Sequence, residues 1–103
     1  MKDMGRMLKQ LQEAQSKMMK TQEELAARTI EGSSGGGMVK ASVNGRNELV
    51  AIKIDPTVVD PSDVEMLEDL ITAAITDAQA RAQEVVRAEM AKATGGLSIP
   101  GLM

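Results

Sequence analysis

Two long segments with helical periodicity enclose a middle region of strand-like alternation, and this order constrains the fold most strongly. Residues 3–27 contain no proline, and apolar residues recur every seven positions at Met4, Leu11, Met18 and Leu25. At about 100° per residue these positions form a narrow apolar stripe along one side of a helix. The pattern therefore predicts a helix over residues 3–27, with a Met-rich stripe that serves for packing.

The middle region indicates three strands. Apolar and polar residues alternate over residues 39–43 and again over 50–55, so each of these strands has one apolar face. Asn44-Gly45-Arg46-Asn47 joins them, and Asn-Gly is a hairpin signal because it tolerates positive φ. Residues 28–31 predict a third, short strand, and the glycine-rich segment 32–37 is expected to form a flexible loop.

A second helix is predicted after Pro56. Two starting points are open: Asp60 as N-cap with Pro61 in the first helical position, or a capping box formed by Ser62 and Glu65. The helical period of apolar residues continues to about residue 93, where two glycines end it.

These elements predict an α+β fold in which a small three-stranded antiparallel sheet is flanked by two long helices, in the order α-β-β-β-α. One domain is expected over residues 1–95, followed by a flexible C-terminal tail over 96–103. Helices of about 25 and 32 residues measure roughly 38 and 48 Å, whereas a 100-residue globule has a radius of gyration of about 13 Å. The helices must therefore overhang the sheet. Because so small a sheet leaves open edges and uncovered apolar stripes, we expect a tweezer-like homodimer with protruding helical arms.

Composition excludes several classes of function. Among 103 residues there is no Phe, Tyr, Trp, Cys or His. Aromatic stacking on bases, thiolate or imidazole metal ligands, and catalysis by cysteine or histidine are therefore excluded. The N-terminus lacks the apolar run of a secretory signal, and no stretch is long and apolar enough to span a bilayer. We expect a cytoplasmic protein with no membrane partner.

Three other chemical motifs are weak. Four carboxylates gather at the start of the second helix: Asp63, Glu65, Glu68 and Asp69. Acidic residues suit the first turns of a helix, and no histidine completes a metal site. Gly37 precedes Met-Val rather than Lys-Ser or Lys-Thr, which argues against a phosphate-binding loop. Ser42 beside Lys40 or Lys53 would permit Ser-Lys catalysis, but nothing marks a pocket. We predict that the protein is not an enzyme and takes no metal, cofactor or small-molecule substrate.

The formal net charge of −3 conceals an uneven distribution: residues 1–30 carry six bases and four acids, and residues 57–103 carry three bases and eight acids. Five bases form what we call the basic ridge of the first helix, on the side opposite the apolar stripe: Lys2, Arg6, Lys9, Lys17 and Lys20. Two interpretations are open. The ridge contacts phosphates of DNA, or it is a solvated face with the pairs Asp3–Arg6, Glu13–Lys17 and Lys20–Glu24.

The bases of the second helix have an ordinary explanation. Arg81, Arg87 and Lys92 each follow an acid by three or four residues and do not share one face, so pairing within the helix accounts for them. If DNA is bound, we expect these three residues to supply secondary DNA contacts.

Several motifs together carry a family resemblance over nearly the whole chain. They are the Met-, Gln- and Lys-rich first helix, Gly35-Gly36-Gly37-Met38-Val39, Val43-Asn44-Gly45, Val50-Ala51-Ile52-Lys53-Ile54-Asp55-Pro56 and Leu67-Glu68-Asp69-Leu70-Ile71-Thr72-Ala73-Ala74. The chain resembles bacterial nucleoid-associated proteins of the YbaB/EbfC type. The resemblance implies a domain that dimerises through its strands, grips double-stranded DNA between projecting helices, alters DNA conformation, and influences nucleoid organisation and transcription.

We therefore expect a homodimer located at the nucleoid, with the basic ridge supplying the main DNA contacts. Without aromatic residues, phosphate contacts dominate and sequence preference is expected to be weak. An alternative of a different class is a non-enzymatic adaptor that docks a partner helix through the Met-rich stripe and the apolar tail.

Overall fold

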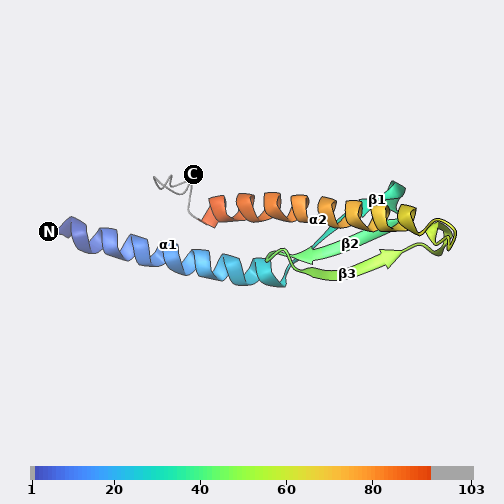
Figure 1. The fold of residues 1–103 in the computed structure, drawn as a ribbon. Helices are drawn as coiled ribbons and strands as arrows, with labels where there is room; N and C mark the ends of the chain where they lie inside the picture. Colours follow the sequence, from blue (N-terminus) through green and yellow to red (C-terminus); the bar gives the residue numbers. More distant parts are fainter. Residues whose placement is uncertain (1, 94–103) are drawn as a thin grey trace.

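The protein is a rod built from two antiparallel helices and one small sheet (Figure 1). The computed structural model describes residues 2–93, with side chains from Asp3 onward. The elements are α1 (Lys2–Ala27), β1 (Thr29–Ser34), β2 (Val39–Asn44), β3 (Leu49–Ile54) and α2 (Val64–Ala93). The predicted α-β-β-β-α order is confirmed. The molecule measures 74 × 23 × 16 Å, with a radius of gyration of 19.5 Å, so the predicted overhang of the helices is also confirmed.

The glycine-rich segment is not the flexible loop that its composition predicted. β1 extends through Ser34, and Gly32 pairs with Ala41 of β2 in the antiparallel ladder. The connection is reduced to residues 35–38, in which all three glycines have positive φ and the N–H of Met38 donates to the carbonyl oxygen of Gly35 at 3.4 Å. Gly32 is glycine for a different reason, because a Cβ there would collide with the backbone of Ala78 in α2. Close packing with a helix therefore keeps this segment in the sheet.

The predicted hairpin between β2 and β3 is confirmed, but the positive φ of its turn is at a different residue from the one expected. Asn47, and not Gly45, has the positive φ, at 66°. The Asn44 side chain accepts hydrogen bonds from the backbone N–H groups of Arg46, at 2.9 Å, and Glu48, at 3.1 Å. Gly45 lies where a Cβ would collide with the carbonyl oxygen of Leu25, and its own N–H donates to that oxygen at 2.9 Å. The turn is therefore joined to the end of α1.

Both predicted starting points of α2 were wrong. The helix begins at Val64, and the carboxylate of Asp63 accepts a hydrogen bond from the N–H of Met66 at 3.2 Å, as an N-cap does. The Asp60 carboxylate instead accepts from the Oγ and N–H of Ser62, which lowers the pKa of Asp60. Because these bonds hold residues 60–62 in a turn, the helix starts at Val64, with Asp63 between the turn and the helix.

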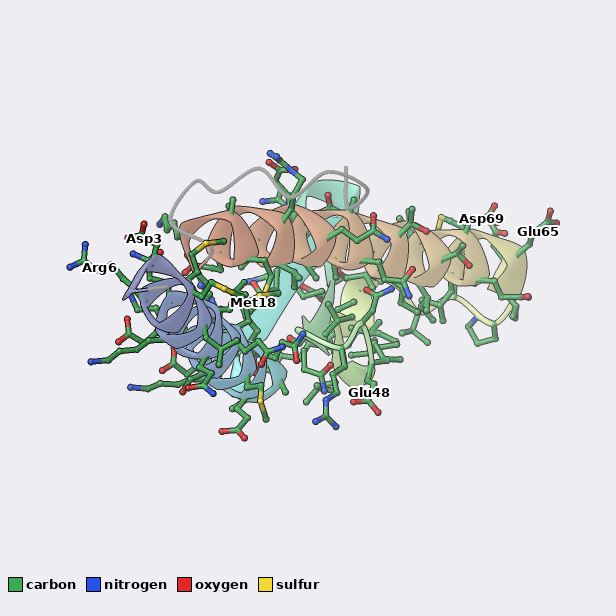
Figure 2. All side chains as sticks on the ribbon, turned by 90° about the vertical axis from the view of Figure 1, so that its left-hand side faces the viewer. Asp3, Arg6, Met18, Glu48, Glu65 and Asp69 are labelled. Atoms are coloured by element: carbon green, nitrogen blue, oxygen red, sulfur yellow. The ribbon has the colours of Figure 1, made fainter. Side chains whose placement is uncertain are left out.

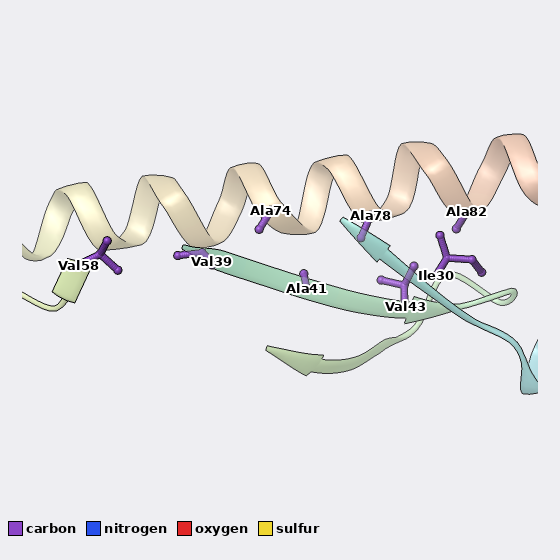
Figure 3. Packing of buried hydrophobic residues seen from close by; sticks show 8 residues of the cluster. All are labelled: Ile30, Val39, Ala41, Val43, Val58, Ala74, Ala78 and Ala82. Carbon is purple, nitrogen blue, oxygen red and sulfur yellow. The ribbon is translucent and has the colours of Figure 1, made fainter. Parts of the chain in front are cut away.

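The core lies between α2 and the first two strands (Figure 3). α2 presents Ala74, Ala78 and Ala82, all buried, to Val39, Val43 and neighbouring side chains of the sheet. Small side chains on the helix permit a close approach, which suits a chain without aromatic residues. β3 lies beyond this cover: Ile52 is half-buried, whereas Leu49, Val50 and Ile54 are exposed. The predicted apolar face of β3 is therefore covered only at Ile52, within the described part of one chain.

The two helices relate differently to the sheet. α2 runs over one face of the sheet along β1 and β2, whereas α1 extends away from the end of the sheet (Figure 1). The last turns of α2 lie beside the second half of α1, where Met90 and Met19 line a common cleft. The first half of α1 projects past the end of α2 as an arm.

Candidate nucleic-acid interface

The described side chains of the basic ridge are exposed to solvent along α1. Arg6, Lys9, Lys17 and Lys20 are exposed, whereas the side chain of Lys2 lies outside the described residues. Within residues 3–93, the ion pairs are confined to α2. The alternative pairs Asp3–Arg6, Glu13–Lys17 and Lys20–Glu24 are therefore not formed in this structure, and four cations of the ridge have no ion-pair partner among these described residues.

The ridge faces away from the rest of the protein because of the helical period. Ala14, Met18 and Leu25 turn toward α2 and are half-buried or buried. Lys9, Lys17 and Lys20 lie on the opposite side of the same helix. Figure 2 shows Met18 between the two helices and Arg6 pointing outward. A large anion can therefore reach the ridge without displacing any packed element.

The cations of α2 have a different environment, and the predicted intrahelical pairing is confirmed. Arg81 pairs with Asp77 at 3.1 Å, Arg87 with Glu84 at 2.5 Å, and Lys92 with Glu89 at 3.5 Å: each of these pairs spans one turn of the helix. The guanidinium of Arg87 donates hydrogen bonds to Glu84, which lowers the pKa of that carboxyl group and raises the pKa of Arg87. These three cations are already neutralised locally.

Asp77 also connects α2 to the sheet. Its Oδ2 accepts the backbone N–H of Ser33 in β1 at 2.9 Å, in addition to the bond from Arg81. The bond from Ser33 is the main cause of the lowered pKa of Asp77. Arg81 is therefore bound to a carboxylate that has a structural role, and a phosphate at Arg81 would compete with its bond to Asp77.

Sequence reasoning overlooked a second open pair of cations. Lys40 and Lys53 are directly opposite each other in the β2–β3 ladder and both are exposed, on the face of the sheet that α2 does not cover. Like charges in this arrangement disfavour the strand pairing slightly. The signal was present in the sequence, because the alternation of both strands and the hairpin between them already place these lysines on one face.

Negative charge gathers at the other end of the rod. The four carboxylates near the start of α2 include Glu65 and Asp69, which Figure 2 shows far from Arg6. Within residues 3–93, no group of three or more carboxylates is arranged to hold a metal ion. The protein is acidic overall, but its cationic arm and its acidic end lie at opposite ends of the rod. This separation reduces the repulsion between the carboxylates and a polyanion bound at the arm.

A shallow cleft of about 400 Å³ lies where α1, the β2–β3 turn and the end of α2 meet. Methionine, leucine and valine side chains form much of its lining, and Gln22, Glu23 and Arg46 supply the polar groups.

None of the helices in the described part of the chain is both long and apolar enough to cross a bilayer.

Comparisons with known proteins agree with this geometry. The chain is 56% identical over 100 residues to nucleoid-associated protein TTE0040 of Caldanaerobacter subterraneus subsp. tengcongensis, covering 97% of this chain and 90% of that protein. It is 55% identical over 101 residues to a nucleoid-associated protein of Moorella thermoacetica, covering 98% and 97%. Among solved structures, the uncharacterized protein HP0035 from Helicobacter pylori matches with a TM-score of 0.64 and 27% identity, over 76% of this chain and 82% of that one.

The family comparison covers almost the whole chain. The model of the YbaB/EbfC DNA-binding family matches residues 1–97, which include both helices, the sheet and all five positions of the basic ridge. The resemblance noted in the sequence is thereby confirmed, and the chain belongs to the YbaB/EbfC DNA-binding family.

Proposed function

We propose that this protein is a nucleoid-associated protein that binds double-stranded DNA as a homodimer, through the basic ridge of α1. The observation that carries the proposal is the set of four ridge cations that have no ion-pair partner within residues 3–93 and lie on the side of α1 that faces away from α2. The family description and the names of the relatives support the same class of function, and they point away from an enzyme.

The spacing of the ridge suits a polyanion. Lys20 lies eleven positions after Lys9, which corresponds to about 16 Å along a helix. Duplex DNA carries one negative charge per about 1.7 Å of its axis, so one arm faces several phosphates. Because these contacts reach the backbone and not the base edges, binding is expected to be sensitive to salt and weakly selective for sequence.

The homodimer is proposed to form at β3. This strand is at one edge of the sheet in the order β1-β2-β3, and its exposed side chains include Leu49 at 50%, Val50 at 57% and Ile54 at 36%. An open strand edge with apolar side chains favours addition of a second sheet. Two protomers joined there would project two arms, which together could grip and deform a duplex, and so affect nucleoid organisation and transcription.

Dimerisation is tested by light scattering after size exclusion. We expect the unaltered protein to have the mass of two chains and the double variant Leu49→Glu, Val50→Glu to shift toward one, because charge repulsion would oppose pairing at this edge. A monomer at every concentration of the unaltered protein would contradict the proposed dimer.

The site is tested by gel shift with a duplex at low and at physiological salt. The ridge variant Lys9→Glu, Lys17→Glu, Lys20→Glu should lose most of its affinity. The matched control Arg81→Glu, Arg87→Glu, Lys92→Glu makes the same change in net charge on α2, where each cation is already paired, and should lose much less. Equal losses in the two variants would show that only net charge matters, and unchanged binding by the ridge variant would refute the proposed site.

A second function is favoured by one observation. The stripe on the projecting part of α1 is exposed at Met4, Met7, Leu8 and Leu11, and a partner helix could dock there, as an adaptor would require. The absence of a gel shift at both salt concentrations would favour this adaptor function over DNA binding.

A further inference from the structure

The apolar stripe of α1 is covered along only part of its length. Leu25 is buried and Met18 is half-buried beneath α2. Farther toward the N-terminus, Leu11 is 60% exposed and Met4 is 73% exposed. These four residues are seven positions apart and lie along one side of the helix. The same side of α1 is therefore apolar along the whole helix, but α2 covers only the part nearer the C-terminal end of α1.

The cover stops because α2 ends. α2 runs antiparallel to α1 (Figure 1), its residue Met90 reaches the cleft beside Met19, and the helix finishes at Ala93. The chain that follows Ala93 therefore starts close to the point where the stripe becomes exposed. Continuing in the direction of α2, it would run along the uncovered half of α1.

We propose that the segment Thr94–Met103 packs along the exposed stripe of its own α1 and continues the cover that α2 begins. Ten residues in an extended conformation reach about 33 Å, and the stripe from Met18 to Met4 measures about 21 Å. Two adjacent glycines and Pro100 oppose continuation of the helix. In an extended segment Leu97 and Ile99 point to one side, so both can contact the stripe near Leu11.

The segment suits this surface better than other occupants do. It contains no charged residue, and its large side chains are Leu97, Ile99, Leu102 and Met103. Because it is attached at the end of α2, its effective concentration at the stripe is of millimolar order. Packing on the stripe would also leave the basic ridge, on the opposite side of α1, open.

The cysteine-free chain allows a direct test. A spin label is attached to Ser98→Cys in the full chain, and the methionine methyl signals are recorded by NMR. We expect the signals of Met4 and Met7 to lose half of their intensity or more, while those of Met38 and Met66, at the other end of α2, keep theirs. Adding Leu97→Ser and Ile99→Ser to the labelled chain should restore the signals of Met4 and Met7.

Three results would overturn the proposal. The first is equal broadening of all four methionines. The second is no change on adding Leu97→Ser and Ile99→Ser. The third comes from mixing an isotope-labelled chain without cysteine with a spin-labelled chain without isotope: broadening that persists in this mixture would assign the segment to the α1 of another copy. None of these readouts depends on DNA, so failure of this proposal and failure of DNA binding are distinguishable.

Discussion

The two helices of this protein have similar lengths and both carry an apolar face, yet they differ in what surrounds them. α2 turns alanines to the sheet and satisfies its three cations with carboxylates one turn away. α1 turns methionines and leucines to a cover that extends over half of its length, and its cations face solvent. The comparison suggests that α2 builds the fold and that α1 is free to bind.

The largest expected difference between the two helices is in how an added methyl group beside each one changes the free energy of unfolding. Gly32→Ala places a Cβ against the backbone of α2 and should lower the free energy of unfolding by about 3 kcal/mol. Gly5→Ala in α1 meets nothing within 4 Å and should raise it by roughly 0.5 kcal/mol, because alanine favours a helix. Urea unfolding followed by circular dichroism at one fixed protein concentration checks both. Similar effects at the two glycines would remove the distinction between the helices.

The start of α2 offers a smaller effect. Asp63→Ala removes the carboxylate that accepts the N–H of Met66 and should cost about 1 kcal/mol of stability. Asp63→Asn or Asp63→Ser keeps an acceptor and should retain most of that stability. If Ser62→Ala, and not Asp63→Ala, were destabilising, the cap would have been assigned to the wrong residue.

The link between α2 and the sheet should depend on pH. The bond from the N–H of Ser33 holds the pKa of Asp77 below its ordinary value of 3.8. The stabilisation is therefore fully present above that value and is lost as the pH falls through the lower pKa of the folded protein. Asp77→Asn should flatten the acid limb of a plot of stability against pH. An acid limb as steep in Asp77→Asn as in the unaltered protein would contradict this assignment.

The smallest effect comes from making α2 resemble α1. Glu84→Gln and Glu89→Gln remove the partners of Arg87 and Lys92, so two cations become available to phosphate. Duplex affinity at low salt should rise by a few-fold at most, because these cations lie away from the proposed contact face. A rise as large as the loss caused by the ridge variant would place the interface on α2 as well.

The sequence alone predicted the elements of the fold, because helical and strand periodicity are local properties. It failed where a distant segment decides the local structure. Gly32 is in a strand because α2 packs against it, and Gly45 is glycine because Leu25 lies against it. The start of α2 was misplaced for a local reason: Asp60 bonds to Ser62 and leaves Asp63 to cap the helix, and composition alone does not choose between neighbouring caps.

The candidate site was predictable to a similar degree. A helical wheel places the basic ridge opposite the apolar stripe, and spacing alone predicted the pairs of α2. Whether Glu13 or Glu24 would pair with a lysine of the ridge could not be decided from spacing, because α1 and α2 both offer acids at suitable intervals. The Lys40–Lys53 pair required the register of two strands.

The central claim is that open cations on α1, and not paired cations on α2, contact DNA. The most direct test is the slope of log affinity against log salt for the unaltered protein, for Lys9→Gln, Lys17→Gln, Lys20→Gln, and for Arg81→Gln, Arg87→Gln, Lys92→Gln. Each phosphate contact contributes about 0.9 to the slope. We predict a markedly shallower slope for the α1 variant and a nearly unchanged slope for the α2 variant. An unchanged slope for the α1 variant would contradict the claim.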